Sequence, residues 1–102
     1  MPVARLASDP VPPAPLTDDE AAFIKETVQR FYGSAAIVRN YGPLASRIDL
    51  HVEVNGHQVM EKYDCIGVLW TRIDREITIV VSAPNARRRG NVKLAYRQGI
   101  IL

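Results

Sequence analysis

Cysteine is nearly absent from this sequence: Cys65 is the single thiol, so no internal disulfide can form. This scarcity is typical of a protein in a reducing compartment. No stretch approaches the roughly 18–20 uninterrupted apolar residues that a helix needs to span a bilayer. The first residues also lack the charged-then-apolar layout of a secretory signal. We therefore expect a cytoplasmic protein that is not associated with a membrane.

Sequence signatures of common catalytic and cofactor sites are missing too. There is no glycine-rich loop that cradles phosphates, and no CxxC, HExxH or GxSxG motif. Cys65 would need a base to act as a nucleophile, and nothing in the sequence places His51 or His57 beside it. We expect Cys65 to be a small buried hydrophobic residue. We also expect no catalytic residues, no cofactor and no metal.

The remaining composition is that of one folded domain. The chain has 102 residues, of which 47% are hydrophobic and 24% are charged, values that are ordinary for a globular protein. Five of the seven prolines lie within residues 1–15, where they prevent a helix or an interior strand. We expect residues 1–15 to be a flexible lead-in and residues 16–102 to form a single α+β domain.

Charge is distributed unevenly along the chain. Residues 1–86 hold all 11 acidic residues and 8 of the 13 basic ones, a net charge of −3 (8 − 11). Residues 87–102 hold no acid and the other 5 basic residues, which are Arg87, Arg88, Arg89, Lys93 and Arg97. The C-terminal end therefore carries a local positive field that can attract a polyanion.

The strongest local signal lies in residues 17–32. Thr17-Asp18-Asp19-Glu20 matches a capping box, and its three acids suit the positive end of a helix dipole. Apolar residues follow at steps of three and four, and Gly33 is a typical helix stop. This pattern predicts a helix over residues 17–32.

Two further segments are typical of strands. Residues 35–39 are short, apolar and partly β-branched, which predicts a buried strand. Apolar and charged residues alternate from residue 47 to residue 54, which is the period of a half-buried strand. Asn55-Gly56 follows, and because this pair is preferred in type I′ turns it predicts a hairpin with residues 57–63.

The register of this hairpin has consequences for the charged residues. Two pairs of opposite charges face each other on the polar side, namely Asp49 with Lys62, and Arg47 with Asp64. His51 and His57 point to opposite faces of the sheet. Glu61 falls opposite Leu50 on the apolar face, which is a misfit in an otherwise consistent pattern.

Later segments leave alternatives open. Residues 64–74 contain an apolar run that suits a strand, which we favour and which would pair with a strand over residues 77–81. The same residues also fit a helix, although Gly67 would weaken it. Residues 91–98 fit a short helix, which is slightly preferred, or a strand. The apolar residues 100–102 are expected to pack back on the body or on a neighbouring chain.

These elements predict an α+β domain of two layers. An N-terminal helix packs on an antiparallel sheet of four to five strands, which is followed by a short C-terminal element. The predicted core consists of the inward apolar residues, which are Ala21, Ile24, Val28, Phe31, Ile37, Ile48, Leu50, Val52, Val68, Trp70, Ile77, Ile79 and Val81. One helix leaves much of the second sheet face uncovered, which predicts a homo-oligomer or cover by the C-terminal tail.

The basic C-terminal segment is the candidate binding site. In a helix over residues 89–98, Arg89, Lys93 and Arg97 align at intervals of four and can follow a row of phosphates. The aromatic ring of Tyr96 can stack on a base. We expect nucleic acid or another polyanion to bind the five basic residues Arg87, Arg88, Arg89, Lys93 and Arg97. The alternative is that these cations are neutralised by acids of the N-terminal part of the domain.

A second cluster, Asp49, His51 and Glu53, lies on one face of a predicted strand. Such a row can bind a metal or transfer protons. Residues two apart on a strand are separated by about 6.5–7 Å, which is wide for ligands of one ion. We therefore favour the interpretation that these residues form the solvent-facing side of an antiparallel sheet.

Three functions remain after these exclusions. The sequence favours a non-enzymatic binding module that contacts a polyanion through its basic C-terminal segment. The alternative is a structural or oligomeric interaction subunit that acts through sheet edges and apolar surface. An enzyme would require the face that carries Asp49, His51 and Glu53 to be a concave site.

Overall fold

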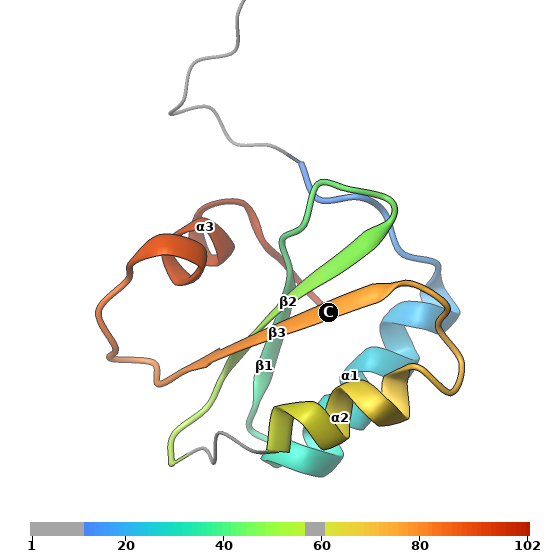
Figure 1. Cartoon of the computed structure of the whole chain (residues 1–102). Coiled ribbons are helices and arrows are strands. Elements are labelled where there is room, and N and C mark those ends of the chain that lie inside the picture. Colours follow the sequence, from blue (N-terminus) through green and yellow to red (C-terminus); the bar gives the residue numbers. More distant parts are fainter. Residues whose placement is uncertain (1–11, 57–60) are drawn as a thin grey trace, which may run out of the picture.

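The computed structural model describes residues 12–56 and 61–102 of the chain. Its elements are, in chain order, α1 (Asp18–Tyr32), β1 (Ile37–Asn40), β2 (Arg47–Glu53), α2 (Glu61–Leu69), β3 (Glu76–Ser82), α3 (Gly90–Gln98) and β4 (Ile100–Ile101). The described residues thus form a small α+β domain with three helices and a four-stranded sheet (Figure 1). None of these helices is long and apolar enough to cross a membrane.

α1 begins and ends where the local signals predict. The Thr17 hydroxyl accepts a hydrogen bond from the Glu20 amide at 3.1 Å, and the Glu20 carboxylate accepts one from the Thr17 amide at 3.0 Å. The predicted capping box is therefore confirmed. Ile24 and Val28 are fully buried on one face of the helix. Gly33 follows the helix with φ of 99°, a conformation that costs little for glycine alone.

The sheet is mixed, so the prediction of a purely antiparallel sheet is wrong. Its strand order is β3-β2-β1-β4. β1 runs antiparallel to both β2 and β4, whereas β2 and β3 run parallel over seven residue pairs, from Arg47↔Glu76 to Glu53↔Ser82. Parallel neighbours need a crossover connection, and α2 provides it.

The hairpin predicted across Asn55-Gly56 does not form. A turn is present there, with Gly56 at φ of 65°, but the chain then enters α2 at residue 61 instead of a second strand. The prediction of a strand over residues 57–63 is therefore wrong for residues 61–63. Residues 57–60, with the predicted direction of His57, lie outside the described residues. β2 pairs with β1 and β3 instead.

Residues 64–74 adopt the helical alternative in their first part, so the preference for a strand there is wrong. α2 buries Cys65 and Leu69 completely. Trp70, which was predicted to lie in the core, is 57% exposed. Gly67 lies on the outer side of the helix, where a Cβ atom would meet nothing within 4 Å. The helix therefore tolerates this glycine because its inward residues pack well on α1 and the sheet.

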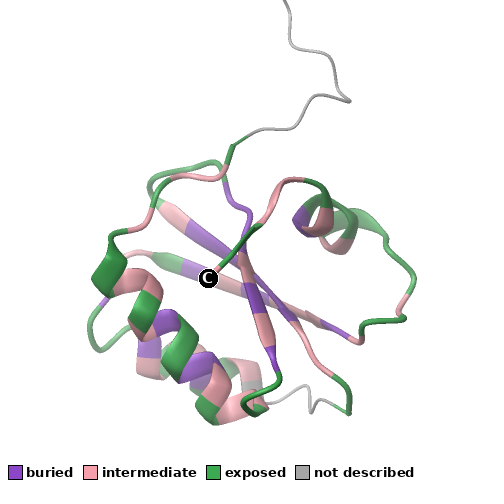
Figure 2. Ribbon diagram, turned by 180° about the vertical axis from the view of Figure 1, so that it is seen from behind, coloured by how far each residue is buried: buried purple, intermediate pink, exposed green. Residues whose placement is uncertain are grey.

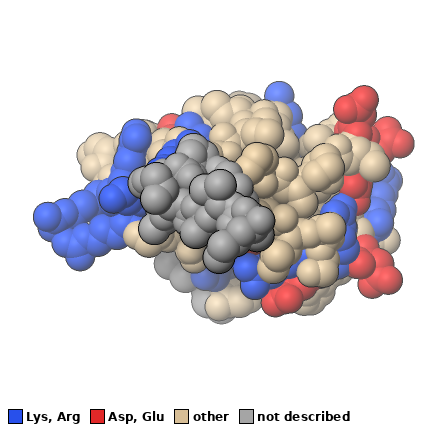
Figure 3. Space-filling view, turned by 90° about the horizontal axis from the view of Figure 1, so that it is seen from above, with Lys and Arg blue, Asp and Glu red and all other residues tan. Residues whose placement is uncertain are grey.

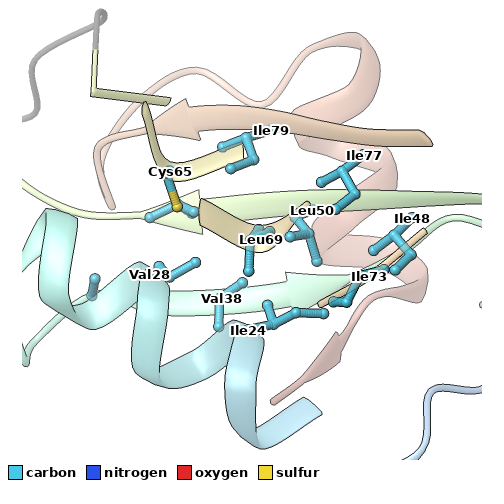
Figure 4. Close-up of a cluster of buried hydrophobic side chains, with 12 residues drawn as sticks. Ile24, Val28, Val38, Ile48, Leu50, Cys65, Leu69, Ile73, Ile77 and Ile79 are labelled. Atoms are coloured by element: carbon cyan, nitrogen blue, oxygen red, sulfur yellow. The ribbon is translucent and has the colours of Figure 1, made fainter. Parts of the chain in front are cut away.

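α1 and α2 pack side by side on one face of the sheet and enclose the core (Figures 1 and 4). Seven of the predicted core residues are confirmed with exposures of at most 4%: Ile24, Val28, Ile48, Leu50, Val52, Ile77 and Ile79. The others are partly buried, apart from the exposed Trp70. Further core residues were not predicted: Ala36, Val38, Leu69 and Ile73.

α3 covers the opposite face of the sheet, so the domain has three layers where two were predicted (Figures 1 and 2). The helical alternative for residues 91–98 is confirmed. The polar side of β2 is consequently not exposed to solvent, since Asp49 is 6% and His51 is 0% exposed. After α3, β4 pairs with β1, and the C-terminal tail thus packs back on the body.

The described part of the lead-in lies against the end of β1. The amide of Ala14 donates a hydrogen bond to the carbonyl of Gly42 at 2.8 Å. The carbonyl of Ala14 accepts one from Asn40 Nδ2 at 3.0 Å. Residues 1–11 lie outside the described residues, so the predicted flexibility of the lead-in stays a prediction for them.

Candidate functional site

The basic residues predicted from the sequence lie together at one end of the molecule. Three of them follow β3 in the connection to α3, and two lie on α3 itself. All five are exposed, and together they are called the basic patch: Arg87, Arg88, Arg89, Lys93 and Arg97. Figure 3 shows Lys and Arg side chains projecting at the end that α3 occupies in Figure 1, with acidic side chains at the opposite end.

Among the described residues, no carboxylate forms an ion pair with a member of the basic patch. The ion pairs of this part of the chain join other residues: Arg39 with Glu53, Arg47 with Asp49, and Arg75 with Glu20. The alternative of neutralisation by N-terminal acids therefore has no support in the described contacts. The field of the patch remains available to an external partner.

A shallow hollow of about 360 Å³ lies on this surface. Its lining residues are Arg88, Lys93, Tyr96 and Arg97. The beginning of α3 adds to the positive potential, because its first turn contains no acidic residue and Arg89 is its N-cap. Three cations around this shallow and open hollow form a place where anionic oxygens can be bound.

Tyr96 connects the basic patch to the sheet. Its hydroxyl donates a hydrogen bond to the Glu53 carboxylate, which also accepts one from Arg39 Nη1 at 3.0 Å. The guanidinium carbon of Arg88 lies 3.6 Å from the centroid of the Tyr96 ring, and that of Arg39 lies 4.4 Å from it. The ring that was predicted to stack on a base is thus already stacked with arginine.

The protonation states in this network follow from its contacts. The hydrogen bond from Tyr96 and the neighbouring Arg39 lower the pKa of Glu53. Burial, together with the hydrogen bond to Glu53, raises the pKa of Tyr96. At neutral pH Glu53 is therefore an ionised acceptor and Tyr96 is a protonated donor.

His51 lies next to Tyr96, with the two ring centroids 5.1 Å apart. His51 Nε2 is 2.7 Å from Ser82 Oγ, a distance at which a histidine can activate a serine nucleophile. However, His51 is 0% and Ser82 is 7% exposed, and neither lines the hollow. Glu53 pairs with Arg39, and His51 Nδ1 has no hydrogen-bond partner among the described residues. The pair therefore acts as a buried link between β2 and β3.

The stability of the protein is expected to fall on mild acidification because of His51. Burial, reinforced by the positive charges of Arg39 and Arg88, lowers the pKa of His51 below its ordinary value of 6.5, against the opposing effect of Glu53. Below that value the unfolded state binds more protons than the folded state, so stability present above pH 6.5 is lost as the pH falls through the folded pKa. The slope from one such group reaches at most about 1.4 kcal/mol per pH unit.

Urea unfolding at several pH values between 7.5 and 5 measures this loss. His51→Gln is the control, because an amide can replace the hydrogen bond to Ser82 but does not titrate. The variant should show a flatter profile than the wild type over this range. Equal profiles would contradict the assignment of this loss to His51.

The charge pairs predicted for the hairpin are wrong. Asp49 Oδ1 accepts a hydrogen bond from Thr78 Oγ1 at 2.7 Å and lies 2.9 Å from Arg47 Nε. Lys62 and Asp64, the predicted partners, belong to α2 on the other face of the sheet. Asp49 thus has partners on β2 and β3, the strands that carry this face.

The described part of the chain contains no cluster of side chains that is suited to metal binding or to thiol chemistry. There, no three His, Cys, Asp or Glu residues are grouped closely enough to hold a metal ion. Burial raises the pKa of the Cys65 thiol to about 11, and the residue is 0% exposed. The prediction that Cys65 is a small buried hydrophobic residue is confirmed.

Comparison with known proteins gives no family assignment. The chain matches no protein-family model, and neither a curated protein nor a solved structure is significantly similar to it. The basic patch and the network beneath it are therefore the basis on which a function can be proposed.

Proposed function

We propose that this protein is a small binding module that holds the phosphate backbone of a nucleic acid on its basic patch. The observation that carries the proposal is the gathering of five exposed cations that have no carboxylate partner among the described residues. Phosphate contacts by lysine and arginine supply most of the affinity of proteins that bind nucleic acids without sequence preference.

The positions of the cations suit a row of phosphates. Lys93 and Arg97 are four residues apart on α3, which separates them by about 6 Å along the helix axis. Arg87, Arg88 and Arg89 directly precede the helix in the chain and add three more cations at its beginning. Arginine side chains add a planar fork of donors that can bind two phosphate oxygens at once.

The network beneath the patch holds this surface in place. Tyr96 is hydrogen-bonded to Glu53 and stacked with Arg88, so α3 and the preceding connection are both attached to the sheet. A cation that is positioned before binding loses less side-chain freedom when a phosphate arrives. The arrangement therefore favours a patch that is preformed in the free protein.

Substitution of the three consecutive arginines tests the proposal. Fluorescence anisotropy with labelled oligonucleotides is measured between about 50 and 200 mM salt, where phosphate-dominated affinities fall steeply. The variant Arg87→Ala/Arg88→Ala/Arg89→Ala is expected to bind at least about tenfold more weakly at the lower salt concentration and to reduce the salt slope by about 2–3.

A matched control removes the same charge elsewhere. Lys25, Arg30 and Arg72 are exposed and belong to the side of the molecule that carries α1 and α2. Their simultaneous replacement by alanine should leave most of the affinity in place. Absence of binding by the wild type at low salt, or an equal loss in both triple variants, contradicts the proposal.

A further inference from the structure

Among the described residues, Tyr96 supplies the one aromatic ring that lines the hollow, and three side chains already lie against this ring. Arg88 lies over the ring with its guanidinium carbon 3.6 Å from the centroid. Arg39 approaches to 4.4 Å, and the ring of His51 lies at 5.1 Å with a tilt of 59°. The hydroxyl is engaged by Glu53. A nucleobase can reach the face under Arg88 only by displacing that side chain.

The exposed aromatic residues of the described chain lie elsewhere. Tyr63, on α2, is 60% exposed, and Trp70, directly after α2, is 57% exposed. α2 packs on the sheet face opposite to α3, at a different end of the molecule from the basic patch (Figure 1). Neither side chain therefore lies beside the cations of the basic patch, where a base of the bound segment could stack on it.

The exposed aromatic rings lie away from the cations of the basic patch, and this separation bears on whether the patch suits a single strand or a duplex. Proteins that hold single strands combine a basic groove with aromatic side chains on which successive bases stack. A duplex keeps its bases stacked inside and presents two rows of phosphates, with one charge per roughly 1.7 Å of axis. The basic patch can bind the phosphates of a duplex, whereas the Tyr96 ring, which Arg88 covers, is not free to stack on unpaired bases.

We infer that the basic patch binds double-stranded nucleic acid through its phosphates in preference to single strands. This inference rests on the proposed function and names the ligand class of the same site. Arg88 has two roles in it, because it supplies a cation and also closes the ring of Tyr96 to bases. Tyr96 is a positioning residue that keeps the guanidinium of Arg88 over its ring.

Competition between matched probes tests the preference. The full chain is titrated with a labelled 20-base-pair DNA duplex, an RNA duplex of the same length, and an unstructured single strand of the same length. At equal salt, either duplex is expected to bind at least about tenfold more tightly than the single strand, because it presents a higher density of phosphate charge. The two duplex probes show which backbone geometry fits better.

Arg88→Ala gives a readout that loss of charge alone does not produce. It removes one cation and uncovers Tyr96, so duplex binding should weaken while single-strand binding is maintained or strengthened. The ratio of the two affinities is therefore expected to fall by about threefold to tenfold, as a stacking platform appears. Arg87→Ala removes the same charge without uncovering the ring and should weaken both probes while leaving their ratio nearly unchanged.

The possible results separate this inference from the function on which it rests. A wild-type protein that binds the single strand as tightly as the duplex overturns the preference and leaves phosphate binding in place. Equal ratios for Arg88→Ala and Arg87→Ala overturn the role assigned to Arg88. Absence of binding to all three probes at low salt overturns both the inference and the proposed function.

Discussion

Leu69→Ala is expected to lower the free energy of unfolding by about 2–5 kcal/mol, the range observed when a buried leucine is truncated and leaves a cavity. Leu69 is 0% exposed and belongs to the core between the two helices and the sheet (Figure 4). Urea unfolding followed by circular dichroism measures the change. The effect is large because the surrounding side chains come from α1, α2 and the sheet, which cannot all shift into the vacated space.

Trp70→Ala is the matched control, since it removes a larger side chain at the next position. Trp70 is 57% exposed and makes a hydrogen bond from Nε1 to the Arg75 carbonyl, so we expect a loss below about 1.5 kcal/mol. A strand over these residues, with Trp70 inward as the sequence suggested, would reverse the order, because successive side chains of a strand point to opposite faces. A larger loss from Trp70→Ala than from Leu69→Ala would therefore contradict α2.

Glu53→Ala is expected to destabilise the domain by about 2–4 kcal/mol, because removal of one member of a nearly buried ion pair leaves the other charge without a partner. The side chains of Arg39 and Glu53 are only 12% and 14% exposed. The same substitution removes the acceptor of the Tyr96 hydroxyl. Amide hydrogen exchange in residues 90–98 should accelerate, since this contact attaches α3 to the sheet.

Two variants show whether the effect belongs to this network. Glu53→Gln keeps an acceptor but not the charge, and should lose less stability than Glu53→Ala. Glu26→Ala removes an exposed carboxylate of α1 and should change stability by less than about 0.5 kcal/mol. If Glu53→Ala costs no more than Glu26→Ala, the network does not hold α3.

Local signals predicted those parts of the fold that depend on neighbours in the chain. The capping box at Thr17 and the glycine after residue 32 set the bounds of α1, and both act within one helical turn. The alternation in residues 47–54 predicted β2, because one side of the strand faces the apolar core. α1 and β2 both form where these signals predict them, although α3 also buries the side of β2 that the alternation assigned to solvent.

The first wrong prediction concerns Asn55-Gly56, because a turn at this pair can be followed by a second strand or by a helix. The pair predicted a hairpin, and two charge matches supported it, but the chain proceeds to α2. The misfit of Glu61 opposite Leu50 was the sign that the register was wrong, because a carboxylate does not belong on the core face. Neighbouring strands of a parallel pair are far apart in sequence, so local pattern does not reveal them.

The candidate site, like the fold, was predicted from the sequence only in part. The sequence alone identified the five cations of the basic patch, because charge that accumulates in a short segment must appear on one region of the surface. The hydrogen bond from Tyr96 to Glu53 depends on α3 covering the polar side of β2, and the buried contact of His51 with Ser82 depends on the pairing of β3 with β2. These contacts join segments that lie far apart in the chain, and they include the packing of Ala95, the buried residue of α3, against the body of the domain.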